Sequence, residues 1–238
     1  MPYHRLFELL AFMLGYRLYV WLRARSQDQI GDEHRLWIFL GAAAGAWLGS
    51  HVLGILEYPD RLGQISWLQL LTDKTIVGGL LGGLIGVELT KKQLGVTTSS
   101  GDLMTYPILL GLAIGRLGCH LAGLNDGTHG NPTALPWGVD FGDGIARHPV
   151  NLYEILFLGL LGLFLFLLEK RRPLADGARF KLFMICYLLW RLFIEFWKPV
   201  WVFPFGLSTI QLAALAGLLY YFALGYKGLR RDVGLEKS

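Results

Sequence analysis

Charged side chains lie within stretches of the sequence that are otherwise apolar. Arg116 belongs to GLAIGRLGCHLAG, residues 111–123, and Arg191 and Glu195 belong to YLLWRLFIEFWKP, residues 187–199. A charge at the centre of a lipid bilayer costs about 2.5–3.5 kcal/mol even on lenient insertion scales. Such side chains pair with one another, hold a ligand or line a pathway. Each of these three groups should therefore have a partner or a chemical task.

The spacing within the second stretch places three polar side chains on one side of a helix. Tyr187, Arg191 and Glu195 follow one another at intervals of four residues, close to one helical turn. One interpretation is an ion pair whose members neutralise each other for insertion into the membrane. The other is a polar face that lines a cavity. Arginine before glutamate is the weaker orientation for a helical pair, and the presence of Arg116 favours the cavity.

The composition indicates whether water or lipid surrounds the folded protein. Of the 238 residues, 53% are hydrophobic and 17% are charged, and the mean hydropathy is +0.44. Apolar segments of about the length needed to cross a bilayer recur at residues 6–22, 36–56, 75–89, 103–124, 150–168, 180–197 and 206–226. We predict an all-α fold, a polytopic membrane protein whose seven transmembrane helices form a single domain over residues 1–238.

The basic residues alternate between the loops that join these segments. One set of loops holds Arg23, Arg25, Arg35, Lys91, Lys92, Lys170, Arg171, Arg172, Arg179, Lys181, Lys227, Arg230, Arg231 and Lys237. The other set holds only Arg5, Arg61, Lys74, Arg147 and Lys198. Lysine and arginine accumulate in short loops on the cytoplasmic side of a membrane. The pattern predicts an N-terminus outside the membrane and a C-terminus in the cytoplasm.

Several other classes of protein are disfavoured. The net charge of +4 follows from the topology, and we expect no nucleic-acid partner because no basic patch with interleaved aromatic residues stands apart from the membrane flanks. The first segment lacks a signal-peptide cleavage site and should be retained. His51, His120, His129 and His148 show no metal-ligand spacing among themselves or with cysteine. We expect neither a metal nor another cofactor.

The sequence contains two kinds of glycine-rich segment, and they predict different structures. The loop NDGTHGNPTALPWGVDFGDGIARHP, residues 125–149, is dominated by turn-forming residues and predicts a small folded cap on the outer side, next to the segment that bears Arg116. VGGLLGGLIG, residues 77–86, and GAAAGAWLGS, residues 41–50, lie inside apolar segments. They predict close helix packing through small residues, since no strand precedes them as in a phosphate-binding loop.

Several sequence blocks together carry a resemblance to a known family. They are GRLG at residues 115–118, RHPVNLYE at 147–154, YLLWRLFIEF at 187–196 and LSTIQLAALAG at 207–217, with GGLIG at 82–86 and the approach from Asp102 to Pro107 fitting as well. In this order they resemble the signature blocks of the prolipoprotein diacylglyceryl transferases over nearly the whole chain. The topology with seven spans and an outer N-terminus is the one that the family implies.

The resemblance implies an activity and a location. Enzymes of this family move the diacylglyceryl group of phosphatidylglycerol onto the thiol of the lipobox cysteine in a prolipoprotein signal peptide, and they release glycerol phosphate. The implied location is the bacterial plasma (inner) membrane, which the chain would cross several times. The acyl-chain preference and the oligomeric state stay open at this point.

The resemblance also implies roles for individual residues. Guanidinium groups in a medium of low dielectric constant bind phosphate and stabilise the negative charge that develops as it leaves. Arg116 and Arg191 are the candidates for this task, with Glu195 orienting Arg191 and Tyr187 contributing a hydroxyl group. Further substrate contacts are expected from Gly118, His148, Tyr153, Glu154 and Glu8. Whether His148 and Glu154 support the cap or help to remove the thiol proton is left open by the sequence.

The sequence departs from the family pattern where the acceptor thiol would be activated. Leu81 stands where the family has a histidine before GGLIG, and Glu8 stands where it has a functional tyrosine. Cys119 replaces the first of two asparagines that follow GRLG, and an insertion moves the acidic group to Asp126. We therefore expect a rearranged catalytic base, with His120 or Glu8 as candidates.

Three interpretations of the function remain. The first is diacylglyceryl transfer to prolipoproteins with this rearranged base. The second is a relative that uses the same lipid donor and another acceptor, such as a hydroxyl or a head group. The third is a non-enzymatic protein that binds or transports lipids, because charges inside the membrane also mark pathways. A structural alternative for Arg116 itself is an ion pair with Glu195 or Asp126.

Overall fold

The computed structural model describes residues 2–64 and 73–232. Seven α-helices form most of this part of the chain: α1 (Pro2–Arg25), α2 (Asp32–Leu56), α4 (Ile76–Leu94), α5 (Asp102–Ala122), α6 (Val150–Arg171), α7 (Ala178–Ile194) and α8 (Thr209–Asp232). Short 3-10 helices and two strands complete it: η1 (Pro59–Gln64), η2 (Gly123–Asp126), β1 (Val139–Asp140), β2 (Ala146–Arg147) and η3 (Glu195–Trp197). The helical fold is confirmed, and each predicted apolar segment overlaps one α-helix, with the segment at residues 180–197 continuing from α7 into η3. Lys237, counted above among the cytoplasmic charges, lies outside the described residues.

The helices differ in how clearly they qualify as membrane spans. Among the helices that the structure describes, α2, α5 and α6 are each long and apolar enough to cross a membrane. A shorter apolar stretch covers residues 209–224 of α8. Helices of this kind in one chain are typical of a polytopic membrane protein.

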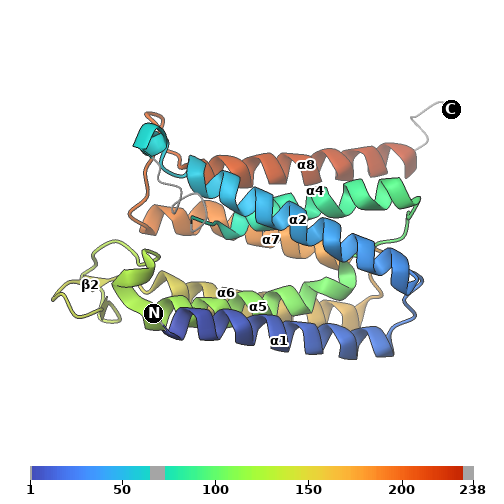
Figure 1. The fold of residues 1–238 in the computed structure, drawn as a ribbon, viewed down its shortest axis with the longest axis horizontal. Coiled ribbons are helices and arrows are strands. Elements are labelled where there is room, and N and C mark those ends of the chain that lie inside the picture. Colours follow the sequence, from blue (N-terminus) through green and yellow to red (C-terminus); the bar gives the residue numbers. More distant parts are fainter. Residues whose placement is uncertain (1, 65–72, 233–238) are drawn as a thin grey trace. The chain divides into compact units, whose positions relative to one another are not determined.

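Contacts divide the chain into two compact units. The first contains α1, α5, α6, the first part of α7 and the segment between α5 and α6, and the second contains α2, α4, the rest of α7 and α8. In Figure 1, α1, α5 and α6 lie side by side. The single domain over residues 1–238 stays a prediction.

In the first unit, small residues let α1 pack closely against α5. A Cβ atom added to Gly118 would lie 2.6 Å from Cβ of Phe7, and one added to Gly15 would lie 3.3 Å from the carbonyl oxygen of Pro107. The two helices are therefore antiparallel. The start of α1 lies beside the end of α5, which bears Arg116.

A polar network at the other end of the first unit fixes α5, α6 and α7. The Asp102 carboxylate accepts a 2.9 Å hydrogen bond from the backbone N–H of Phe180. The Tyr106 hydroxyl donates to Glu169 Oε2 at 3.0 Å, and Arg179 forms an ion pair with the same Glu169. Three helices thus share one set of charges at this end.

In the second unit, glycines bring the backbones of α2 and α4 into contact. A Cβ atom added to Gly82 would lie 2.2 Å from the carbonyl oxygen of Gly45, and one added to Gly49 would lie 2.4 Å from that of Gly78. Real Cβ atoms essentially never approach a backbone oxygen so closely. The predicted packing through small residues is confirmed, and these glycines form a helix interface of the small-xxx-small type.

The interface predicts a site-specific loss of stability. Gly82→Ala should lower the melting temperature in detergent, because overpacking a close interface costs about 1–3 kcal/mol. Gly79→Ala on the same helix is the matched control, since its Cβ would meet the nearest atom, Ser50 Cβ, at an ordinary 3.7 Å. Equal melting temperatures for the two variants would contradict the close contact.

Candidate functional site

Arg116 lies on α5 and is buried within the first unit. Its Nε atom is 2.8 Å from Oε2 of Glu154 on α6. The two residues expose only 5% and 2% of their surface. The predicted intramembrane arginine therefore has a partner, and this partner is a carboxylate on the neighbouring helix.

The pair also fixes how α5 and α6 meet. Removing one member of a buried ion pair costs about 3–5 kcal/mol, because the other charge then stays buried without compensation. Both helices are also long and apolar enough to cross a membrane. The contact places a carboxylate beside the planar guanidinium group of Arg116.

A chain of hydrogen bonds reaches the same face of α6 from the segment that follows α5. Buried Asn151 donates to Oγ1 of Thr128 at 3.2 Å, and this hydroxyl donates to Oδ2 of Asp126 at 2.6 Å. Asn151 and Glu154 are three residues apart and so share one face of the helix. The shifted acidic residue Asp126 thus lies at the end of the first unit that holds Arg116.

An aromatic cluster supports the cap. Trp137 donates its indole N–H to the Tyr153 hydroxyl at 2.8 Å, and Nδ1 of His148 lies 3.4 Å from the same oxygen. The ring of His148 also lies 6.3 Å from the ring of Trp197, between centroids. Of the two roles that the sequence left open for His148, these contacts favour support of the cap.

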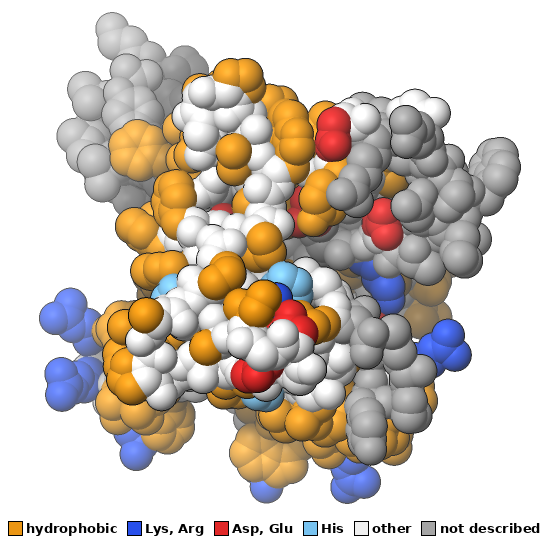
Figure 2. All heavy atoms as spheres, turned by 90° about the vertical axis from the view of Figure 1, so that its left-hand side faces the viewer, with side chains coloured by type: hydrophobic (Ala, Val, Ile, Leu, Met, Phe, Trp, Pro, Cys, Tyr) orange, Lys and Arg blue, Asp and Glu red, His pale blue; other side chains and the backbone are white. Residues whose placement is uncertain are grey.

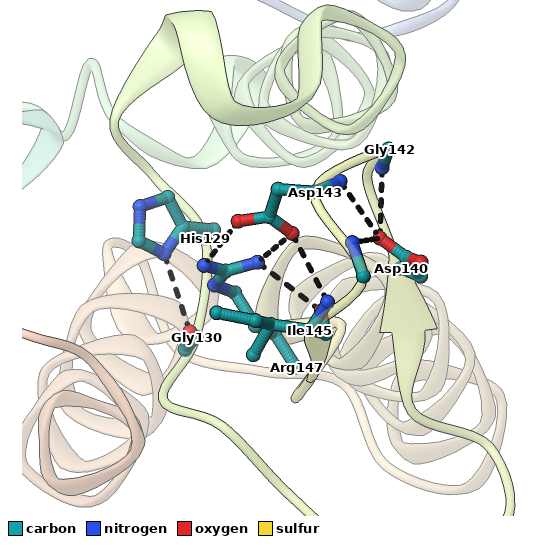
Figure 3. A network of polar contacts seen from close by, with 8 residues as sticks. His129, Gly130, Asp140, Gly142, Asp143, Ile145 and Arg147 are labelled. Carbon is teal, nitrogen blue, oxygen red and sulfur yellow. Dashed lines mark hydrogen bonds and ion pairs between the residues drawn. The ribbon is translucent and has the colours of Figure 1, made fainter.

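The cap contains a two-stranded hairpin that the sequence did not predict. Strand β1 pairs antiparallel with β2, and the turn between them is closed by Asp140, whose Oδ1 accepts from the N–H of Gly142 at 2.8 Å. Figure 3 shows Asp143 facing Arg147, with both carboxylate oxygens 2.7 Å from the guanidinium nitrogens. Beside this pair, Nδ1 of His129 lies 3.2 Å from the carbonyl oxygen of Gly130.

Arg147 changes the titration of its partner in the cap. Its hydrogen bonds lower the pKa of Asp143 to about 2, and the carboxylate in turn raises the pKa of Arg147. The pair therefore stays charged throughout the neutral and mildly acidic range. The cap surface in Figure 2 carries hydrophobic and acidic side chains, and the blue side chains of Lys and Arg lie mainly at the margins of the picture.

His120 lies one helical turn after Arg116. Its ring packs edge-on against Phe141 of the cap, with 5.7 Å between centroids. Its Nδ1 atom is buried without a hydrogen-bond partner among the described residues. The role of His120 as a catalytic base stays a prediction.

Glu8 lies near the same end of the first unit. It directly follows Phe7, which contacts Gly118 two residues beyond Arg116. Its side chain is half-buried on α1. Gly118 itself is buried and leaves room for Phe7, and its expected contact with the substrate stays a prediction.

The second polar set of the sequence lies in the second unit. Arg191 and Glu195 form a buried ion pair within one turn, where α7 passes into η3. Tyr187 is fully buried one turn earlier. Of the two interpretations of the spacing, the structure shows the ion pair, which the sequence disfavoured; the cavity that it favoured stays a prediction.

Leu81 fills its position with apolar contacts. A Cβ atom added to Gly217 of α8 would lie 2.9 Å from Cδ2 of Leu81 and 2.8 Å from Cδ1 of Leu188. The side chain at the family histidine position is therefore packed against α8. In the part of the chain that the structure describes, no group of three or more His, Cys, Asp or Glu residues could hold a metal ion.

Most of the charged residues of the site could be identified from the sequence, but some of their contacts could not. Asn151 and Thr128 were not singled out, although RHPVNLYE contains the asparagine. Their signal in the sequence is weak, because a polar residue at the start of a helix is common. The Arg116–Glu154 pair joins two separate signature blocks, a link that only the packing of α5 on α6 makes visible.

Comparisons with known proteins agree with these blocks. The sequence model described as prolipoprotein diacylglyceryl transferase matches residues 3–226. The chain is 30% identical to the phosphatidylglycerol–prolipoprotein diacylglyceryl transferase of Nitrosomonas europaea, over 96% of this chain and 87% of the relative. It is 29% identical to the protein of the same name from Wolbachia pipientis, over 92% and 90%. A third protein of that name, from Bordetella parapertussis, is 42% identical over 48% of this chain and 46% of its own length.

The family match covers all seven described helices, from the start of α1 into α8. It also includes both buried arginine–glutamate pairs and the whole cap. On this evidence from sequence, the chain belongs to the prolipoprotein diacylglyceryl transferase family of membrane transferases.

Proposed function

We propose that this protein transfers the diacylglyceryl group of phosphatidylglycerol to the lipobox cysteine thiol of prolipoproteins and releases glycerol phosphate. The relatives from Nitrosomonas and Wolbachia carry this donor and this acceptor in their names. The proposed location is the bacterial plasma membrane, crossed by all seven helices, with the cap outside and the C-terminus in the cytoplasm.

The observation that carries the proposal is the buried pair of Arg116 and Glu154. A guanidinium group offers five N–H donors in a rigid plane, which matches the geometry of phosphate oxygens. Glu154 holds this plane through its contact with Nε. A group fixed in this way needs no reorganisation when negative charge develops on a bound phosphate.

The reaction places that charge on the leaving group. The acceptor sulfur attacks the glycerol carbon that bears the phosphate oxygen, so a C–S bond forms as the C–O bond breaks. The electron pair of the broken bond stays on the phosphate, which gains one negative charge. The thiol proton passes to a base.

Arg191 supplies a second guanidinium group in this proposal. Its ion pair with Glu195 lies at the end of α7, and both side chains are buried. Glu195 therefore orients Arg191 as Glu154 orients Arg116. Tyr187 is the proposed hydroxyl contact.

A second candidate is the same lipid donor with a different acceptor. It is favoured by the apolar packing of Leu81 against Gly217 of α8, since no proton acceptor occupies the family histidine position. An acceptor with other requirements for activation would be consistent with this change. Transfer to a lipobox peptide separates the two candidates.

The phosphate role of Arg116 predicts that lysine cannot replace it. Arg116→Lys keeps the charge but loses the planar set of donors. Release of glycerol phosphate should fall by about 10²–10³, taking oxyanion-hole donors as the nearest measured analogy. The melting temperature in detergent should change little, because a lysine can still pair with Glu154.

Arg179→Lys is the matched control for this experiment. Arg179 also forms an interhelical pair with a glutamate in the first unit, Glu169, at the opposite end of α6. The control should keep the release rate. Near-normal release by Arg116→Lys with unchanged phosphatidylglycerol affinity, or an equal loss in Arg179→Lys, would contradict the phosphate role.

The base that accepts the thiol proton is predicted to be His120 or Glu8. His120→Ala or Glu8→Gln should lower turnover per folded molecule by about 10²-fold or more, as for other general bases. His129→Ala is the control, because that ring nitrogen contacts a backbone carbonyl. Leu81→Ala should lower the melting temperature and leave turnover per folded molecule nearly unchanged. Normal turnover in both His120→Ala and Glu8→Gln would remove these bases and favour the other acceptor.

The proposed orientation can be tested with two exposed alanines. Ala134 lies in the cap and Ala175 in the loop between α6 and α7. An impermeant maleimide should label Ala134→Cys in intact spheroplasts and Ala175→Cys only after the membrane is opened. Labelling in the reverse order would overturn the placement of the cap and of the site beside it.

A further inference from the structure

A buried glutamine connects the start of α8 to the end of α7. Gln211 exposes only 2% of its surface. Its side-chain oxygen accepts from the N–H of Ser208 at 2.8 Å, and its side-chain nitrogen donates to the carbonyl oxygen of Leu192 at 2.9 Å. Both ends of the amide are therefore bonded, as a buried polar group requires.

The contacts between Ser208 and Gln211 form an arrangement that is common at the start of a helix. Ser208 precedes α8, and its Oγ accepts from the N–H of Gln211 at 3.1 Å. Together with the bond from the Ser208 N–H to the Gln211 oxygen, this forms a capping box. A capping box uses only the oxygen of the residue at this position, so a glutamate would serve equally well. The amide nitrogen of Gln211 is therefore additional to helix capping.

That nitrogen bonds to the last turn of α7. The final four carbonyl groups of a helix have no partner within it, and Leu192 lies two residues before the end of α7 at Ile194. Leu192 follows Arg191 directly, and Glu195 begins η3 three residues later. The amide thus holds the backbone between the two members of the buried ion pair.

Other contacts show that α7 and α8 approach closely. Gly217, on α8, has no room for a Cβ atom beside Leu188 of α7. Gln211 lies nearer the end of α7 than this contact. It provides a directional link at the turn where Arg191 and Glu195 pair, whereas the contact at Gly217 is apolar and without direction.

We propose that Gln211 is a positioning residue that holds the end of α7 so that Arg191 and Glu195 keep the geometry needed for the lipid phosphate. The inference rests on the function proposed above for Arg191. A displacement of about 1 Å at a substrate-positioning group can lower a rate about 10²-fold. A role in capping alone would affect the stability of α8 and leave the geometry of α7 unchanged.

Three variants separate positioning from capping. Gln211→Met removes the bond to Leu192 and the capping oxygen. Ser208→Ala is the matched control, because it removes a capping oxygen and leaves the bond to Leu192. Gln211→Glu keeps an oxygen for the Ser208 N–H, and its ionised carboxylate has no donor for Leu192. It is the variant of choice if Gln211→Met does not fold.

Two measurements on the full-length protein in lipid nanodiscs test the proposal. Amide hydrogen exchange over residues 192–197 reports the order of the last turn of α7 without reference to activity. Release of glycerol phosphate from phosphatidylglycerol in the presence of a lipobox peptide gives kcat and KM. We expect faster exchange over residues 192–197 and a kcat about 10- to 100-fold lower in the Gln211 variants. Ser208→Ala should melt at a lower temperature and keep kcat within about twofold.

The outcomes distinguish this proposal from the proposed function. Unchanged exchange over residues 192–197 in the Gln211 variants overturns the positioning role. An equal loss of kcat in Ser208→Ala overturns it as well, because capping would then account for the effect. If the wild-type protein releases no glycerol phosphate, the proposed function fails, and faster exchange confined to the Gln211 variants still supports the structural part of the inference.

Discussion

A guanidinium group buried among apolar helices needs a compensating charge, and the first unit is organised around this constraint. Nε of Arg116 on α5 lies 2.8 Å from Oε2 of Glu154 on α6. The pair can form only where these two helices meet closely and in one register. The hydrogen bonds from Asn151 to the segment after α5 and the aromatic support of the cap by Tyr153 follow on the same stretch of α6. The stability of the helix pair and, in the proposed function, the binding of the lipid phosphate thus depend on the same two side chains.

The second unit meets the same constraint in a different way. Arg191 and Glu195 lie on one helix end, so their pairing does not by itself hold two helices together. That task falls to Gln211, which bonds the end of α7 to the start of α8, and to glycines that let α2 and α4 touch. When both charges lie on one helix, the packing of that helix sets the orientation of the pair. The uncharged amide of Gln211 is therefore important for the orientation of this pair.

Much of the fold could be predicted from the sequence, because apolar segments of membrane length and small-residue patterns are local signals. The helix that contains Leu81 and the close packing of the two glycine-rich segments are examples, although only the structure shows that Gly82 meets Gly45. The partner of Arg116 could not be predicted in the same way. The sequence suggested Glu195 or Asp126 as a structural partner, and the structure shows Glu154, because the choice depends on which helices pack together. The hairpin of the cap was missed because strands of two residues leave no periodic pattern.

The central claim is that the Arg116 guanidinium group, held by Glu154, contacts the phosphate of the lipid donor. The most direct measurement is solid-state NMR of the protein with ¹⁵N,¹³C-arginine in membranes of phosphatidylglycerol, detecting guanidinium carbons whose signals are dephased by ³¹P. We predict that one strongly dephased guanidinium signal of the wild-type protein is lost in Arg116→Lys, while the signal of Arg191, the second proposed phosphate contact, remains. The same dephased signals in both proteins would show that the phosphate contacts belong to other arginines and would contradict the account.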